Sequence, residues 1–224
     1  MDRRFLAILG GIIVILGAFF VISQNSSSNK SSNQSTNSTA QPTNNVIGDN
    51  AKGVTLVEYG DFQCPVCGLY YQTVKDLTTK MKPDIKFQFR NLPITQIHPN
   101  AFAAARAAQA AALQGKFWEM HDQLYTNQST WASSTAPLAF FKTYAKAIGL
   151  DMTKFEKDYA STATNDVINA DIAEFNKTGQ QVATPTFFVN GKVIDNKDLA
   201  GSNGFPSVDK FVAIINTEAA KQKK

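Results

Sequence analysis

The only two cysteines of this 224-residue chain are separated by two residues, in the run Cys64-Pro65-Val66-Cys67. Two thiols at this spacing can form a disulfide and exchange it, because a thiolate attacks a disulfide sulfur through a mixed-disulfide intermediate. The attacking sulfur must be accessible and must have a lowered pKa. Thiol–disulfide exchange is therefore the first chemistry that the sequence indicates.

Two other uses of the cysteine pair fit the sequence less well. A structural zinc site needs four ligands, and the only histidines, His98 and His121, do not lie at a paired ligand spacing. A purely structural disulfide would close so short a loop that it removes little entropy from the unfolded chain. We expect both histidines to be structural, with His98 orienting the start of a helix and His121 packing beside Trp118.

The elements around the cysteines explain how one sulfur could be activated. Residues 54–59 are rich in β-branched side chains and predict a strand, a helix follows to about Met81, and residues 85–89 alternate as a second strand. Cys64 thus lies at a helix N-terminus, where unpaired N–H groups and the helix dipole stabilise a thiolate. Pro65 suits the first helical position. Cys64 would attack or be attacked, and Cys67, one turn further, would resolve the mixed disulfide.

The rest of the folded region predicts helices and then a hairpin. Asn190-Gly191 is a favoured hairpin turn between apolar runs, and Asn100 and Ser207 are suited to capping helices. The expected helices cover residues 101–114, 117–125, 137–148, 151–159, 165–177 and 208–220, and the expected hairpin covers 185–194. The two halves of the sheet are about a hundred residues apart, so the intervening helices are most simply an insertion into an α/β core.

The motifs together resemble one family. The segments 58–67, His98-Pro99-Asn100-Ala101, 114–118 and 184–191 are similar to those of DsbA-like thiol–disulfide oxidoreductases. The resemblance implies a thioredoxin-like α/β fold with an inserted helical domain. We expect this domain at residues 51–220, with the insertion at about 96–180 and a lysine-rich tail at 221–224.

The resemblance also implies roles for particular residues. Cys64 matches the nucleophile and Cys67 the resolving cysteine. Pro185, after Thr184, matches a cis-proline that faces the disulfide and binds substrate backbone. Glu58 matches a buried acid that relays protons near the resolving cysteine, whereas the alternative reading makes it a surface carboxylate at a strand edge.

The residue before the second cysteine departs from the family pattern. The best-known oxidising members carry histidine there, and this chain has Val66, which brings no charge to the thiolate. We therefore expect a less depressed pKa and a less oxidising disulfide. Pro65, Val66, Thr184 and Pro185 are expected to contact substrate.

The N-terminal region predicts export and tethering. Residues 5–22 form an apolar run after Arg3 and Arg4, about 27 Å long as a helix, which favours an uncleaved membrane anchor at 1–23 over a cleaved secretory signal. Residues 24–50 are rich in Ser, Asn, Thr and Gln and are expected to be a flexible linker. The folded domain would be extracytoplasmic, or secreted if the segment is cleaved.

The charge distribution argues against nucleic acid as a partner. The net charge is +4, but residues 2–4, Lys30 and the three C-terminal lysines together carry +5, which leaves −1 for the rest of the chain.

The expected function is a membrane-tethered thiol oxidase that donates its disulfide to reduced, exported proteins. The resemblance implies reoxidation by a quinone-linked membrane partner, and no metal or bound cofactor. A reductase or isomerase of the same fold, and a non-catalytic binding module or chaperone, remain alternatives.

Overall fold

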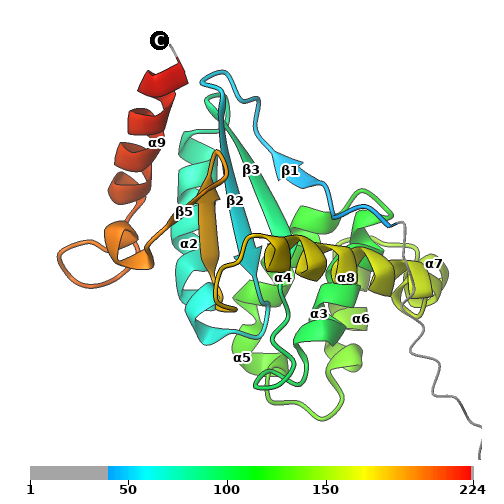
Figure 1. Ribbon diagram of the computed structural model, residues 1–224. Coiled ribbons are helices and arrows are strands. Elements are labelled where there is room, and N and C mark those ends of the chain that lie inside the picture. Colours follow the sequence, from blue (N-terminus) through cyan, green and yellow to red (C-terminus); the bar gives the residue numbers. More distant parts are fainter. Residues whose placement is uncertain (1–39, 223–224) are drawn as a thin grey trace, which may run out of the picture. The chain divides into compact units, whose positions relative to one another are not determined.

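The computed structural model of the chain describes residues 40–222, in which a five-stranded sheet is flanked by helices (Figure 1). The strand order is β1-β3-β2-β4-β5. The central strands β2 and β3 are parallel, and every other pair is antiparallel. The strands are β1 (Asn45–Ile47), β2 (Val54–Gly60), β3 (Ile85–Asn91), β4 (Thr186–Val189) and β5 (Lys192–Ile194).

Helices cover both faces of this sheet. Helix α2 (Pro65–Lys80) joins β2 to β3, and α9 (Val208–Gln222) packs beside it. Because side chains alternate along a strand, Leu56 faces the core shared with α2, whereas Tyr59 faces the opposite side. There Tyr59 packs against Phe175 of helix α8 (Thr162–Lys177), with ring centroids 5.0 Å apart.

The segment between β3 and β4 is helical, as the sequence predicts, and the α/β fold with a helical insertion is confirmed. The insertion contains α3, which is rich in buried alanines that allow close helix packing. Its helices are α3 (Ala101–Ala112), α4 (Phe117–Thr126), α5 (Gln128–Trp131), α6 (Pro137–Ala147), α7 (Met152–Tyr159) and α8.

Some boundaries differ from the sequence expectation. Strand β1 and the buried Thr43 lie in the range that was expected to be a flexible linker. This segment forms a strand because β1 pairs with the edge of β3. Helix α8 begins three residues earlier than expected, where the Ser161 side chain accepts a hydrogen bond from the Thr164 N–H. Asn100 precedes α3 but does not cap it with its side chain. Helix α5 and the 3-10 helix η1 (Asn196–Leu199) were not expected.

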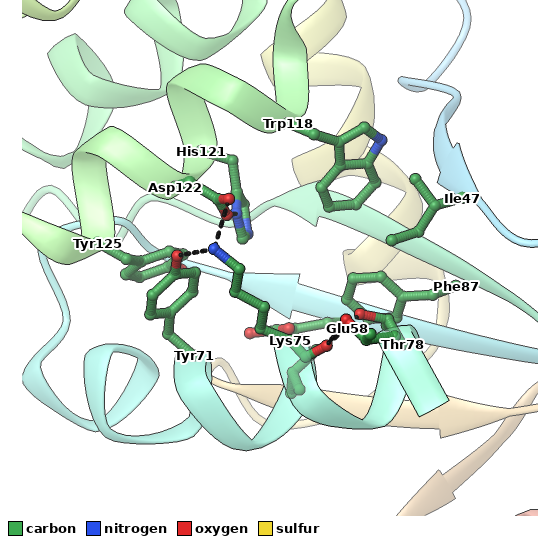
Figure 2. Close-up of a pocket in the computed structure, with 12 residues that line it drawn as sticks. Ile47, Glu58, Tyr71, Lys75, Thr78, Phe87, Trp118, His121, Asp122 and Tyr125 are labelled. Atoms are coloured by element: carbon green, nitrogen blue, oxygen red, sulfur yellow. Dashed lines mark hydrogen bonds and ion pairs between the residues drawn. The ribbon is translucent and has the colours of Figure 1, made fainter. Parts of the chain in front are cut away.

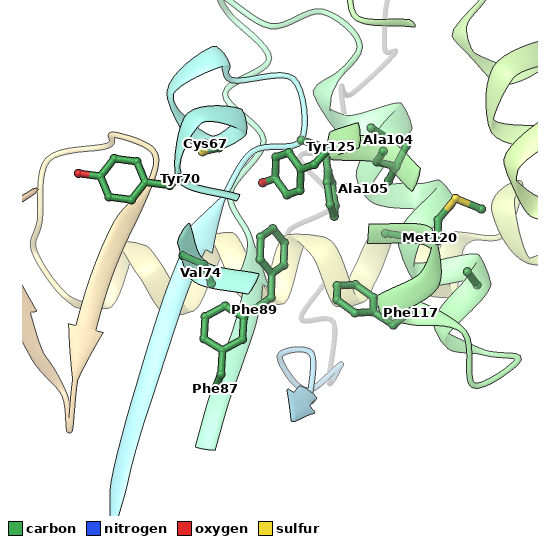
Figure 3. Close-up of a cluster of buried hydrophobic side chains, with 14 of the residues drawn as sticks. Cys67, Tyr70, Val74, Phe87, Phe89, Ala104, Ala105, Phe117, Met120 and Tyr125 are labelled. Atoms are coloured by element: carbon green, nitrogen blue, oxygen red, sulfur yellow. The ribbon is translucent and has the colours of Figure 1, made fainter. Parts of the chain in front are cut away.

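Cys67 belongs to the main hydrophobic core. Figure 3 shows Cys67 near Tyr70 and Tyr125, within a cluster that reaches from the sheet into the insertion. Cys67 has no exposed surface. The cysteine pair is therefore backed by well-packed side chains, and of the two sulfurs only that of Cys64 is near the surface.

A fully buried carboxylate, Asp171 of α8, joins three separate segments. Its oxygens accept hydrogen bonds from the N–H (2.8 Å) and hydroxyl (2.7 Å) of Thr43, and from the N–H and side-chain amide of Asn91, both at 2.9 Å. Arg90 Nη1 lies 3.2 Å away. The insertion, strand β3 and the N-terminal segment are thus held by one side chain.

We expect Asp171→Ala to lower the free energy of unfolding by about 3–5 kcal/mol, because it leaves buried donors and the Arg90 cation unpaired. Chemical denaturation of both proteins would measure this. Asp76→Ala is the matched control, since Asp76 is exposed and, among residues 40–222, its side chain bonds only Gln72; it should change stability by at most about 0.5 kcal/mol. Equal losses in the two variants would contradict the assigned importance of Asp171.

The expected membrane anchor lies outside the described residues. Among residues 40–222, no helix is long and apolar enough to cross a membrane.

Candidate active site

Cys64 lies at the N-cap of α2, with extended backbone angles (φ −66°, ψ 121°), and Pro65 follows at the first helical turn. The first turn of α2 contains no acidic side chain, so no carboxylate there weakens the stabilisation that the helix dipole gives to a thiolate on Cys64. The Cys64 side chain is 6% exposed, Cys67 is fully buried, and both are free thiols. The geometry leaves Cys64 as the sulfur that another protein can reach.

The two thiols have opposite pKa shifts. A hydrogen bond from the Cys67 thiol lowers the pKa of Cys64 to about 5, helped by the Thr184 side chain and the N–H groups of Cys67 and Val66, although burial opposes the shift. Burial is the main reason that the pKa of Cys67 is well above its ordinary value, and the neighbouring Cys64 raises it further. At neutral pH the reduced pair is therefore a Cys64 thiolate beside a Cys67 thiol.

The loop before β4 lies directly against this pair. The Thr184–Pro185 peptide bond is cis, and the Cys64 sulfur lies 3.4 Å from the Thr184 carbonyl oxygen, to which it donates a hydrogen bond while it is a protonated thiol. The Asn196 side chain donates to the Pro185 carbonyl at 2.9 Å. The structure thus brings together Cys64, Cys67, Thr184 and Pro185, which the sequence places 120 residues apart.

The residues between the cysteines face outward. Pro65 is exposed, and Val66 is 47% exposed and carries no charge. Both are accessible to a polypeptide docked over Cys64.

Glu58 is buried in β2, between β3 and β4, and not at the edge of the sheet. It lies two residues from Leu56 and so faces the side that α2 covers. Burial, and then the charge on Cys64, raise the pKa of Glu58 to about 8. The alternative reading of a surface carboxylate is therefore wrong, and at neutral pH Glu58 holds a proton close to the buried Cys67.

Comparisons with known proteins agree with this geometry. A sequence profile described as thioredoxin matches residues 40–205. The chain belongs to the thioredoxin family. A thioredoxin-like oxidoreductase from Silicibacter pomeroyi DSS-3 is 26% identical, with a TM-score of 0.60 over 80% of this chain and 90% of that one.

Two further solved structures share the fold. BdbD from Bacillus subtilis, in its oxidised form, is 25% identical, with a TM-score of 0.65 over 81% of this chain and 97% of that one. The alpha-DsbA1 of Wolbachia pipientis has the same fold, with a TM-score of 0.64 at 20% identity over 82% and 96% of the two chains. The resemblance to DsbA-type oxidoreductases that the sequence suggested is confirmed.

Some curated relatives are much longer proteins. The Na(+)/H(+) antiporter NhaA 1 of Mycolicibacterium gilvum is 38% identical over 148 residues, which are 62% of this chain and 22% of that protein. The corresponding protein of Salinispora arenicola is 40% identical over 152 residues, again 22% of its length. The chain spans about a fifth of these relatives.

Asp61 was not singled out by the sequence, yet it organises the loop before Cys64. Its N–H lies 3.5 Å from the Cys67 sulfur. Its buried carboxylate accepts hydrogen bonds from the N–H groups of Gln63 (2.8 Å) and Ile94 (2.9 Å), and lies 2.7 Å from His98 Nδ1. The structural role expected for His98 is therefore explained by its contact with the Asp61 carboxylate. A carboxylate three residues before a cysteine is a weak signal by itself.

The helical insertion also holds the active-site loop. The Gln128 side chain, at the start of α5, donates to the carbonyls of Phe62 (2.8 Å) and Cys64 (2.9 Å). Gln63 donates to the Ala132 carbonyl at 2.7 Å and accepts from the Asn100 N–H at 2.6 Å. No sequence pattern marks these glutamines, because their partners are backbone groups that only the tertiary fold brings near.

Proposed function

We propose that this protein is a membrane-tethered, extracytoplasmic thiol oxidase that donates the Cys64–Cys67 disulfide to exported proteins. The observation that carries the proposal is the pairing of opposite thiol pKa shifts, because a stabilised Cys64 thiolate is a good leaving group. The export of the domain rests on the apolar segment 5–22 after Arg3 and Arg4.

The reaction balances in two steps. A substrate thiolate attacks the Cys64 sulfur, the Cys64–Cys67 bond breaks, and Cys67 leaves as a thiolate that takes up a proton. A second substrate thiolate then attacks the substrate sulfur of the mixed disulfide, and Cys64 leaves as a thiolate. The substrate loses two electrons, which the cysteine pair gains, and a quinone-linked membrane partner would remove them.

Glu58 fits the role of proton donor to Cys67. It is protonated at neutral pH and close enough for its charge to raise the pKa of Cys67. The leaving Cys67 thiolate would take its proton from Glu58 rather than from bulk water, which does not reach it.

The surface around Cys64 suits an unfolded substrate. Val66 and Leu69, on the first turns of α2, are 47% and 48% exposed, and Val182, just before the cis-proline loop, is 50% exposed. Exposed apolar side chains favour segments that a folded protein would bury. Pro65, Thr184 and Pro185 would complete the contact with the substrate backbone.

The direction of exchange can be tested by redox titration against glutathione. A Cys64 pKa of about 5 lies between those of thioredoxin, about 7, and the strongest oxidant of this type, about 3.5. We therefore expect a reduction potential between about −270 and −120 mV. Val66→His should raise the potential, because an imidazolium there stabilises the Cys64 thiolate.

A potential at or below about −270 mV would overturn the oxidase proposal and favour a reductase. Alkylation followed by mass spectrometry would report the fraction of disulfide at each glutathione ratio.

A further inference from the structure

Asp61, in the loop between β2 and α2, contacts both cysteines through its backbone. Its N–H lies 3.5 Å from the Cys67 sulfur, and its carbonyl accepts a hydrogen bond from the Cys64 N–H at 3.1 Å. Cys67 has no exposed surface, so bulk water cannot solvate a negative charge on this sulfur. A backbone donor that is already directed at the sulfur can stabilise such a charge in place of water.

The Gly60–Asp61 peptide, which carries this N–H, is held by the segment between β3 and α3. Its carbonyl, on Gly60, accepts a hydrogen bond from the Leu92 N–H at 2.8 Å. The Asp61 carboxylate accepts from the Ile94 N–H at 2.9 Å and lies 2.7 Å from His98 Nδ1. Because a carboxylate can only accept, Nδ1 of His98 carries the proton in this contact. The direction of the Asp61 N–H is thus fixed before any reaction begins.

Three donors hold the buried carboxylate of Asp61. Its side chain has no exposed surface, whereas that of His98 is 13% exposed. The Gln63 N–H supplies the third hydrogen bond, at 2.8 Å. A buried carboxylate is tolerated only where hydrogen bonds offset the loss of its hydration. The loop that presents the Asp61 N–H to Cys67 therefore depends on a histidine 37 residues further along the chain.

Breaking the Cys64–Cys67 bond places an electron pair on Cys67. A thiolate that attacks the Cys64 sulfur forms a new S–S bond, and the electron pair of the old bond leaves with the Cys67 sulfur. Burial raises the pKa of Cys67 well above its ordinary value, and the Asp61 N–H acts in the opposite direction. The leaving sulfur is therefore a poor one unless its developing charge is stabilised locally.

The contact with Asp61 is separate from the proton donor. Figure 2 shows Glu58 at the inner end of a cavity of about 220 Å³ between α2 and α4. Neither Asp61 nor His98 lines this cavity. Glu58 can neutralise the Cys67 thiolate with a proton, whereas the Asp61 N–H can stabilise the charge while the S–S bond is still breaking.

We propose that Asp61 and His98 are positioning residues, which hold the Asp61 N–H on the Cys67 sulfur so that it stabilises the negative charge in the transition state of disulfide cleavage. The relevance to exported proteins rests on the proposed function. In the oxidised protein Cys67 is part of a disulfide, and in the reduced protein it is a neutral thiol. Because neither end state has a thiolate on Cys67, loss of the contact slows exchange in both directions and leaves the reduction potential unchanged.

Reduction of the oxidised full-length protein by dithiothreitol measures this step without a protein substrate. Acid quenching, alkylation and mass spectrometry give the rate constant. In Asp61→Asn an amide N–H2 replaces one oxygen, so at least one hydrogen bond of the carboxylate is lost. We expect the rate constant to fall about tenfold, less than after loss of an oxyanion donor, because sulfur is a weaker acceptor than oxygen. The equilibrium constant with glutathione should stay that of the wild type.

A pair of variants at the more exposed partner tests the same contact. His98→Leu removes the donor to Asp61 and should slow reduction to a similar extent. His98→Asn keeps an amide N–H near the place of Nδ1 and should recover most of the wild-type rate. Alkylation of Cys64 by iodoacetamide should be unchanged in all three variants, because Cys67 is not a leaving group in that reaction.

Asp171→Asn is the control for a merely structural effect. Asp171 is also a buried carboxylate that joins separate segments, but within residues 40–222 it bonds to neither cysteine. This variant should lose stability without slower reduction. Reduction of Asp61→Asn or His98→Leu as fast as that of the wild type would overturn the proposal, as would equal slowing in Asp171→Asn or an equal loss of Cys64 alkylation. The expected slowing in a protein with thioredoxin's reduction potential would overturn the proposed oxidase function alone.

Discussion

Replacing Cys64 with serine should reduce the oxidative refolding of a reduced, disulfide-containing protein to the background rate, because serine cannot form the disulfide that is donated. Cys67→Ser, mixed with a disulfide-bonded protein, should instead accumulate a mixed disulfide, because the Cys64 thiolate attacks the substrate disulfide and a serine hydroxyl cannot then displace the substrate from Cys64. The chain has no third thiol to do so. Non-reducing electrophoresis and mass spectrometry would identify the trapped species.

The two serine variants also decide between an enzyme and a binding module. Cys64 is only 6% exposed and Cys67 is fully buried, but both changes replace a sulfur with a smaller oxygen, so circular dichroism should show an intact fold. Refolding activity retained by Cys64→Ser would support a non-catalytic chaperone of thioredoxin fold. Loss of activity without any trapped adduct in Cys67→Ser would also contradict the proposed mechanism.

The second large effect is the pH dependence of alkylation. Cys64 should react with iodoacetamide with a midpoint near pH 5, because its pKa is lowered to about 5. The reaction should be fast above that pH and slow as the pH falls below it, when the thiolate is protonated. An ordinary thiol, with a pKa of about 8.5, is only a few per cent thiolate at pH 7. Cys67 should stay unmodified, because it is buried and its pKa is raised.

A pair of variants tests the cause of this shift. The hydrogen bond from Cys67 is the largest contribution to the lowered pKa of Cys64. Cys67→Ala removes the donor and should move the alkylation midpoint to higher pH, whereas Cys67→Ser keeps a hydroxyl donor and should move it less. Equal midpoints in the two variants would show that the helix N-terminus and Thr184 suffice.

Features that depend on local pattern could be read from the sequence. The C-x-x-C after a β-branched run predicted a reactive sulfur at a helix N-terminus, and Asn190-Gly191 predicted the β4–β5 hairpin. The helix boundaries were mostly right, because Gly115, Gly149 and Gly179 adopt the positive φ that ends a helix.

Features that depend on distant partners could not be read in this way. Strand β1 looked like linker because three residues become a strand only beside the edge of β3. Asp171 and Gln128 are ordinary polar residues on the helices, and their importance comes from backbone groups 80 and 64 residues away.

The sequence by itself determined which atoms can react: two cysteines, at one helix N-terminus, with Val66 between them in place of a charge. The tertiary structure decided how their protons are held. It placed the Thr184 carbonyl against Cys64, buried Cys67, and set Glu58 at the end of a cavity. The reason is physical, since helix and turn formation depend on neighbours in the chain, whereas burial and pKa depend on everything that packs around a group.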